Sequence, residues 1–157
     1  MNFIDFLLII MLSMLPFWEA RYTVPLIISK YPYPLIILAI LSNFFPVPFI
    51  LKFLQPIEKW LRKWKFWNDL LNKIFEHTRK KTKKSIEKWE SLALIIFVAV
   101  PLPVTGAWTG SLAAYLFGLN FKKSLICIFI GICIAAIIVA IATIMGIKFL
   151  NFFKSIF

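Results

Sequence analysis

The sequence predicts an all-α integral membrane protein, and three observations lead to this fold class. Apolar residues make up 61% of the 157 positions and charged residues only 16%, whereas soluble domains are about half apolar and about a quarter charged. Four long apolar stretches flank one charged centre. Proline and glycine interrupt several of these stretches, a pattern tolerated at membrane depth where the backbone is buried in protein or lines a wet cavity. We expect a single membrane domain over residues 1–157.

Two of the apolar stretches, residues 35–54 and 124–147, are long enough to cross a bilayer, which takes roughly 20 apolar residues. The other two, residues 3–29 and 92–119, are broken, and their first apolar halves are too short to span as helices. We interpret them as two re-entrant hairpins that return to the side they came from; the alternative is a kinked, complete span in each case. The residues interpreted as hairpin and helix breaks outside the second hairpin tip are Pro16, Pro25, Asn43, Pro46 and Pro48.

The charged centre, residues 55–90, contains 11 of the 18 lysine and arginine residues. Cytoplasmic loops carry such an excess, so we expect this segment on the cytoplasmic side of the cell membrane in a multi-pass topology. Tryptophans at helical spacing predict an amphipathic helix lying in the interface. We expect anionic lipid head groups, rather than nucleic acid, as the partners of the basic cluster. Its lysines are Lys80, Lys81, Lys83 and Lys84.

The resulting organisation is an inverted repeat. A hairpin followed by a crossing helix occupies residues 1–54, and the same pattern recurs over residues 91–157 on the other side of the basic segment. If residues 55–90 are cytoplasmic, the two halves face opposite ways, a recurring plan of secondary transporters. Because so few helices cross the membrane, one copy could hardly enclose a cavity. We therefore expect a homo-oligomer, namely a dimer.

The candidate chemistry lies in the two hairpins. Glu19 and Arg21 are embedded in the first, where an isolated charge costs roughly 2.5–3.5 kcal/mol on insertion scales, so such residues usually have partners and a function. Glu19 could be a protonatable coupling site and Arg21 an anion clamp; the alternative is a static ion pair, or an arginine reaching the interface. The second hairpin tip offers amides, hydroxyls and an indole to a substrate or proton, or else is only a tight turn with packing glycines. Its candidate residues are Pro101, Pro103, Thr105, Gly106, Trp108, Thr109 and Gly110.

Enzymatic patterns are not found in the sequence. His77 is the single histidine, and no phosphate-cradling or dinucleotide-binding glycine motif occurs. Cys127 and Cys133 point to different faces of one helix, which argues against a disulfide. We therefore expect no enzyme activity, no cofactor and no metal, and an N-terminus that is retained because it lacks a basic region and a cleavage site.

Three runs of residues carry a family resemblance: LPFWEARYTVP from Leu15, SNFFPVPFI from Ser42, and VPLPVTGAWTG from Val100. They resemble the small multidrug export proteins, and more remotely the DedA membrane proteins. The resemblance implies re-entrant hairpins and transport or lipid translocation, with the acidic and arginine residues of the hairpins important. Val104 and Ser42 stand where this family pattern has glycine.

These observations favour a proton-coupled secondary carrier of a small molecule, with a midplane site formed by Glu19, Arg21 and the tip at residues 101–110. The first alternative is a lipid-phosphate flippase or scramblase, in which Arg21 would hold the head group. The second alternative is a non-transporting scaffold that binds anionic lipid through its basic segment.

Overall fold

The computed structural model describes residues 3–16, 18–61, 63, 84–102 and 105–156, and every regular element in this part of the chain is an α-helix. The predicted all-α class is confirmed. Two helical stretches are long and apolar enough to cross a membrane, Leu35–Glu58 and Phe121–Phe149. They are the two stretches for which the sequence predicts complete spans. The inverted relation of the halves and the re-entry of the hairpins into a membrane stay predictions.

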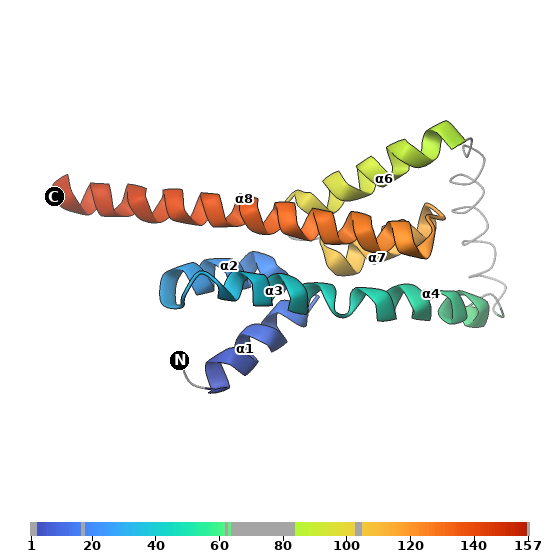
Figure 1. Ribbon diagram of the computed structural model, residues 1–157, viewed down its shortest axis with the longest axis horizontal. Helices are drawn as coiled ribbons and strands as arrows, with labels where there is room; N and C mark the ends of the chain where they lie inside the picture. The colour runs from blue at the N-terminus through green and yellow to red at the C-terminus, as the bar shows by residue number, and fades with distance from the viewer. Residues whose placement is uncertain (1–2, 17, 62, 64–83, 103–104, 157) are drawn as a thin grey trace.

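The first half of the chain consists of two short helices and a long helical rod. Helices α1 (Phe3–Met14) and α2 (Glu19–Lys30) run in opposite directions, and α3 (Leu35–Phe44) and α4 (Val47–Leu61) then follow one another along almost one line (Figure 1). Pro16 lies in the break after α1, where its missing amide and rigid ring prevent a regular helix from continuing.

The second half repeats this order of elements. Helices α6 (Lys84–Ala99) and α7 (Ala107–Leu116) form a second hairpin, and α8 (Phe121–Ile156) runs the length of the molecule (Figure 1). Pro101 lies in the break after α6. Gly118, in the turn before α8, has φ +72°, a left-handed conformation that glycine adopts at little steric cost.

Two sequence predictions about breaks and bounds need correction. Pro25 does not break the first hairpin but lies inside α2. Pro25 lacks the amide that would bond to the Arg21 carbonyl one turn earlier, and a helix can absorb one such gap when it is packed against other elements. The apolar helices also extend into the charged centre, because α4 continues to Leu61 and α6 already begins at Lys84.

Most of the predicted interfacial helix lies outside the described residues. Lys80, Lys81 and Lys83 fall in that part, and Lys84 is described only as the first residue of α6. The lipid-binding role of these lysines therefore stays a prediction.

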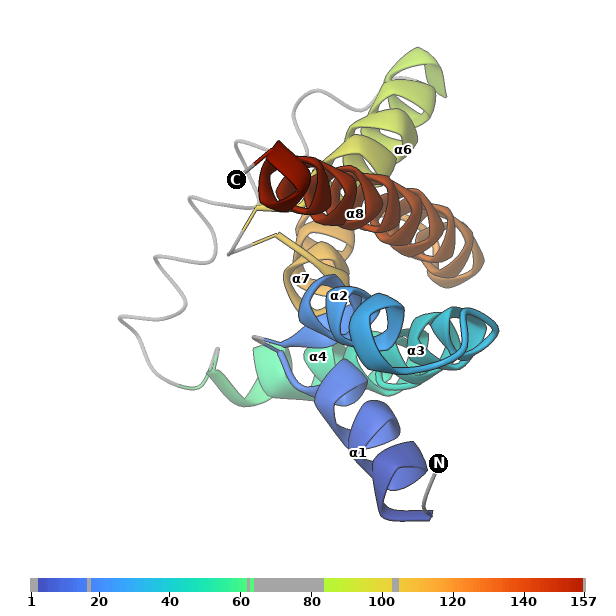
Figure 2. The same cartoon turned by 90° about the vertical axis from the view of Figure 1, so that its left-hand side faces the viewer.

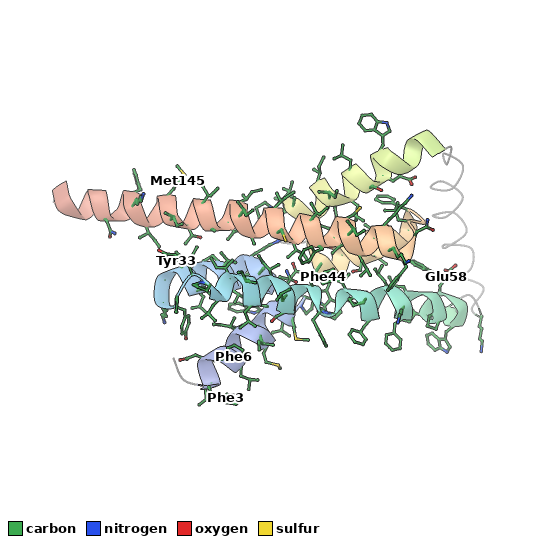
Figure 3. The ribbon with its side chains drawn as sticks, viewed as in Figure 1. Phe3, Phe6, Tyr33, Phe44, Glu58 and Met145 are labelled. Atoms are coloured by element: carbon green, nitrogen blue, oxygen red, sulfur yellow. The ribbon has the colours of Figure 1, made fainter. Side chains whose placement is uncertain are left out.

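Helix α8 organises the packing of both hairpins. It lies against α6 on one side and against α2 on the other, while α1 projects away from it (Figure 2). Close approach to α6 depends on Gly131, because a Cβ there would lie 2.6 Å from Cβ of Val98. Figure 3 shows Phe44 between α3 and α8, where its ring meets that of Phe129 edge-on at a centroid distance of 5.1 Å.

Large apolar side chains cover much of the outside. Met145 on the C-terminal half of α8 and Phe3 on α1 both point away from the other helices (Figure 3), with 66% and 79% of their surface exposed. Soluble proteins rarely expose contiguous apolar surface on this scale, so this exterior suits lipid.

Candidate functional site at the crossing of the hairpins

The turns of the two hairpins meet in the middle of the molecule (Figure 1). Hydrogen bonds join them. The Trp108 indole Nε1 donates to the Met14 carbonyl at 3.1 Å, and the Arg21 guanidinium donates through Nη1 to the Leu102 carbonyl. Residues more than 80 positions apart in the sequence thus form one small region, which we call the hairpin crossing: Glu19, Arg21, Leu102 and residues 106–108.

Glu19 connects the first hairpin to the start of α7. Its side chain is buried, with 4% of its surface exposed, and its carboxylate interacts with the backbone amides of Ala107 and Trp108 at the start of α7. The carboxylate lies so close to Gly106 that a Cβ at that position would overlap it. The free amides and partial positive charge of a helix N-terminus favour an anion, so Glu19 fills an anion site that the second hairpin provides.

The backbone of Glu19 has an uncommon conformation that directs its carboxylate to this place. Its φ is +46°, in the left-handed region that non-glycine residues rarely occupy and that costs on the order of 1–3 kcal/mol. The Thr23 hydroxyl donates to the Glu19 carbonyl at 2.8 Å and helps to hold the start of α2. Strain of this kind persists only where the surroundings compensate for it, as the amides of α7 do here.

Arg21 contacts the turn between α6 and α7. Its bond to Leu102 lies in the turn after α6, where the same carbonyl also accepts the Thr105 amide at 3.2 Å. Its second nitrogen, Nη2, is buried and has no hydrogen-bond partner among the described residues. Glu19 and Arg21 attract each other, and Arg21 also donates to the Leu102 carbonyl. The role of these two residues, as a working site or as a static ion pair, stays a prediction.

The remaining predicted tip residues serve mainly the turn and its packing. The Thr105 hydroxyl donates to the Val100 carbonyl at 2.6 Å and so closes the turn. Gly110 allows α7 to pack on α6, because a Cβ there would lie 2.5 Å from Val98 Cγ2. Thr109 has a buried hydroxyl without a partner among the described residues. Pro101 is exposed in the turn, and Pro103 lies outside the described residues.

Asn43 belongs to this region, although the sequence analysis identified it only as a helix break. It lies within α3, is 3% exposed, and lines a small cavity together with Glu19, Arg21 and Gly106. The other two predicted breaks of this stretch, Pro46 and Pro48, flank the start of α4. An amide inside an otherwise apolar crossing stretch was the signal that could have identified Asn43.

An apolar groove reaches the hairpin crossing from outside. It has a volume of about 400 Å³, follows α4 through Phe45 and Phe53, and includes Met14 and Trp108, the two residues joined across the hairpins. A second groove of about 270 Å³ between α1 and α3 shares Met14 and Phe45 with the first. Among the described residues, no three histidine, cysteine, aspartate or glutamate side chains are grouped as metal ligands would be.

Comparison with known proteins agrees with the resemblance seen in the sequence. The family model described as "Putative small multi-drug export protein" matches residues 19–138. No curated protein and no solved structure matches the chain. The matched region begins at Glu19 and includes both sides of the hairpin crossing. The chain therefore belongs to the small multi-drug export protein family.

Proposed function

We propose that this protein is a proton-coupled secondary carrier of small molecules whose working site is the hairpin crossing. The observation that carries the proposal is the Glu19 carboxylate, which is buried against Gly106 and interacts with the amides of Ala107 and Trp108. A secondary transporter with broken helices binds anionic substrate groups at such half-helix N-termini. In this chain the anion at that place is a titratable side chain.

Protonation of Glu19 would weaken the contact between the hairpins. The α7 amides are attracted to a carboxylate by its charge, and hydrogen bonds to charged groups are roughly twice as strong as neutral ones. A neutral Glu19 would retain at most weak bonds to Ala107 and Trp108. Arg21, with its bond to Leu102, would then be the main polar contact between the hairpins. Cycles of protonation would thus alternate a closed crossing with one that can open.

The substrate class follows from the volumes beside the crossing. The cavity between Glu19, Arg21 and Asn43 is only about 10 Å³, far below the roughly 300 Å³ of a small-molecule pocket. The groove along α4 is large enough, at about 400 Å³, and ends at Trp108. We therefore propose an apolar or amphiphilic substrate that reaches the crossing along this groove when the hairpins part.

The same groove favours a second candidate function. A lipid acyl chain also fits an open, apolar groove on the outside of a membrane protein, and Arg21 would then interact with the head group, as in a flippase or scramblase. The scaffold alternative rests on Lys80, Lys81, Lys83 and Lys84, and nothing in the described residues favours it.

The test is transport in proteoliposomes of native protein, Glu19→Gln and Arg21→Ala, with Glu90→Gln as the matched control. Glu90 undergoes the same chemical change but lies on α6 away from the crossing. A fluorescent amphiphilic cation and a fluorescent anionic lipid are followed separately, each with and without a pH gradient. We expect gradient-driven movement of the small molecule that Glu19→Gln abolishes and Glu90→Gln preserves.

Movement of the lipid alone would establish the second candidate instead. Movement of neither probe, under either pH condition, would contradict both transport functions. Equal activity of Glu19→Gln and Glu90→Gln would contradict the assignment of the crossing as the working site.

A further inference from the structure

The cavity at the hairpin crossing has the size of one water molecule. Its volume is about 10 Å³, close to the minimum of roughly 10–15 Å³ that a single buried water requires. Apart from its polar residues, it is lined by apolar side chains of α6 and α8, among them Val98, Ile132 and Ala135. The cavity thus lies where α2, α3, α6, α7 and α8 come together.

Two of the polar side chains that line this cavity have unused hydrogen-bonding atoms. Asn43, which is 97% buried since only 3% of its surface is exposed, has a buried Oδ1 with no partner among the described residues. Arg21 has a buried Nη2 in the same condition. A buried polar atom without a partner costs about 1–3 kcal/mol, so two of them beside one cavity call for a ligand that satisfies both.

The chemistry of these atoms selects that ligand. The Asn43 oxygen and the Glu19 carboxylate only accept hydrogen bonds, whereas the Arg21 nitrogen only donates. A cation would satisfy the two acceptors but be repelled by the guanidinium, and an anion would be repelled by the carboxylate. A water molecule donates two hydrogen bonds and accepts at least one, and buried waters typically make about three.

We propose that this cavity binds one water molecule, which donates to Glu19 and Asn43 and accepts from Arg21. Asn43 is the positioning residue that holds it from α3. This binding is independent of transport. The further role that we assign to the water, as the immediate proton carrier to and from the Glu19 carboxylate, rests on the proposed function.

The test measures contact between water and Glu19 by water-edited solid-state NMR of carbon-13-labelled protein in lipid bilayers. The Glu19 carboxyl signal is identified as the one missing from Glu19→Gln. We expect strong transfer of magnetisation from water to this carboxyl in the native protein. Asn43→Leu, which fills the cavity and removes an acceptor, is expected to lose most of that transfer.

Two further variants make the result decisive. Ala135→Val fills the cavity from α8 without changing any polar group and is expected to reduce the transfer as well, which covers the case in which Asn43→Leu does not fold. Ser13→Ala is the matched control, because the Ser13 hydroxyl is also buried and unpaired among the described residues but does not line the cavity. It is expected to leave the transfer unchanged.

Two results would overturn the proposal: a native Glu19 carboxyl as dry as carbons of the apolar core, or a transfer that survives in both cavity-filling variants. Because this readout needs no substrate, it separates the water site from the transport function. A bound water in a protein that moves neither probe would preserve the site and remove only its role in proton transfer.

Discussion

The two hairpins contribute different kinds of group to the place where they meet. The first hairpin supplies side-chain charge, through Glu19 and Arg21, whereas the second supplies backbone, through the amides of Ala107 and Trp108 and the carbonyl of Leu102. The second hairpin brings no charged side chain from its described residues to the crossing. Burial of either hairpin alone would leave polar groups without partners, which are charges in the first hairpin and backbone groups in the second.

In the proposed carrier, this difference would allow the crossing to act as a switch. Backbone amides do not titrate, so the second hairpin is a constant partner. A carboxylate does titrate, so the strength of the contact depends on the protonation of the first hairpin alone. Four substitutions therefore test the contribution of each hairpin separately.

The largest effect is expected for Gly106→Ala on the backbone side of the crossing. The new Cβ would overlap the Glu19 carboxylate, and overpacking in a buried site typically costs about 1–3 kcal/mol. We expect a loss of unfolding free energy at the upper end of that range, measured by denaturation in mixed detergent micelles. Gly146→Ala is the matched control, because nothing lies within 4 Å of its Cβ. Equal stability of the two variants would contradict the placement of Glu19 against Gly106.

The next effect is expected for Arg21→Met on the charged side. It removes the donor to the Leu102 carbonyl while retaining an unbranched apolar side chain. Hydrogen bonds to charged groups contribute about 1.5–3 kcal/mol, and half-exposure of Arg21 puts the expected loss near the bottom of that range. The same denaturation measurement applies. Arg21→Lys, which preserves the charge but not the planar fork, should recover part of the loss; no recovery would indicate that the charge is unimportant.

A smaller effect is expected for Trp108→Phe, which removes a neutral bond between the hairpins. Loss of the indole donor to the Met14 carbonyl should cost about 1 kcal/mol, the usual contribution of a neutral hydrogen bond. Because Trp108 also lines the apolar groove, the ring must be retained in the variant. A loss larger than that of Arg21→Met would show that the uncharged contact dominates the crossing.

The smallest effect is expected for Tyr31→Phe, which acts within the first hairpin only. The Tyr31 hydroxyl donates to Asp5 at 3.0 Å and ties the end of α2 to the start of α1. This hydrogen bond raises the pKa of Tyr31. Its stabilising effect should therefore be fully present below the unfolded tyrosine pKa of about 10 and be lost as the pH rises through the folded value. The melting temperatures of the native protein and Tyr31→Phe should differ slightly at neutral pH and converge once the pH exceeds the folded tyrosine pKa. A difference that does not change with pH would contradict the assignment.

Prediction from the sequence succeeded where the signal was local and failed where it was not. Pro16 and the break after α6 were predicted correctly, since a missing amide or a rigid ring interrupts a helix wherever it lies. Pro25 was predicted as a break by the same rule, but the helix continues through it, because a packed helix can tolerate one missing amide. Asn43 was read as a break rather than as a cavity residue, because its surroundings come from helices distant in the sequence.

Composition and the pattern of apolar residues were enough to indicate a membrane protein and to locate the breaks at Pro16 and after α6. An apolar share of 61% and two stretches long enough to cross a bilayer indicate a membrane protein. The sequence also indicated that Glu19 and Arg21 need partners, because charges at membrane depth are costly. The groups that act as these partners can be identified from the tertiary structure alone. The amides that receive Glu19 and the carbonyl that receives Arg21 lie more than 80 residues away. Every residue has an amide and a carbonyl, so only the fold decides which of them meets a charge.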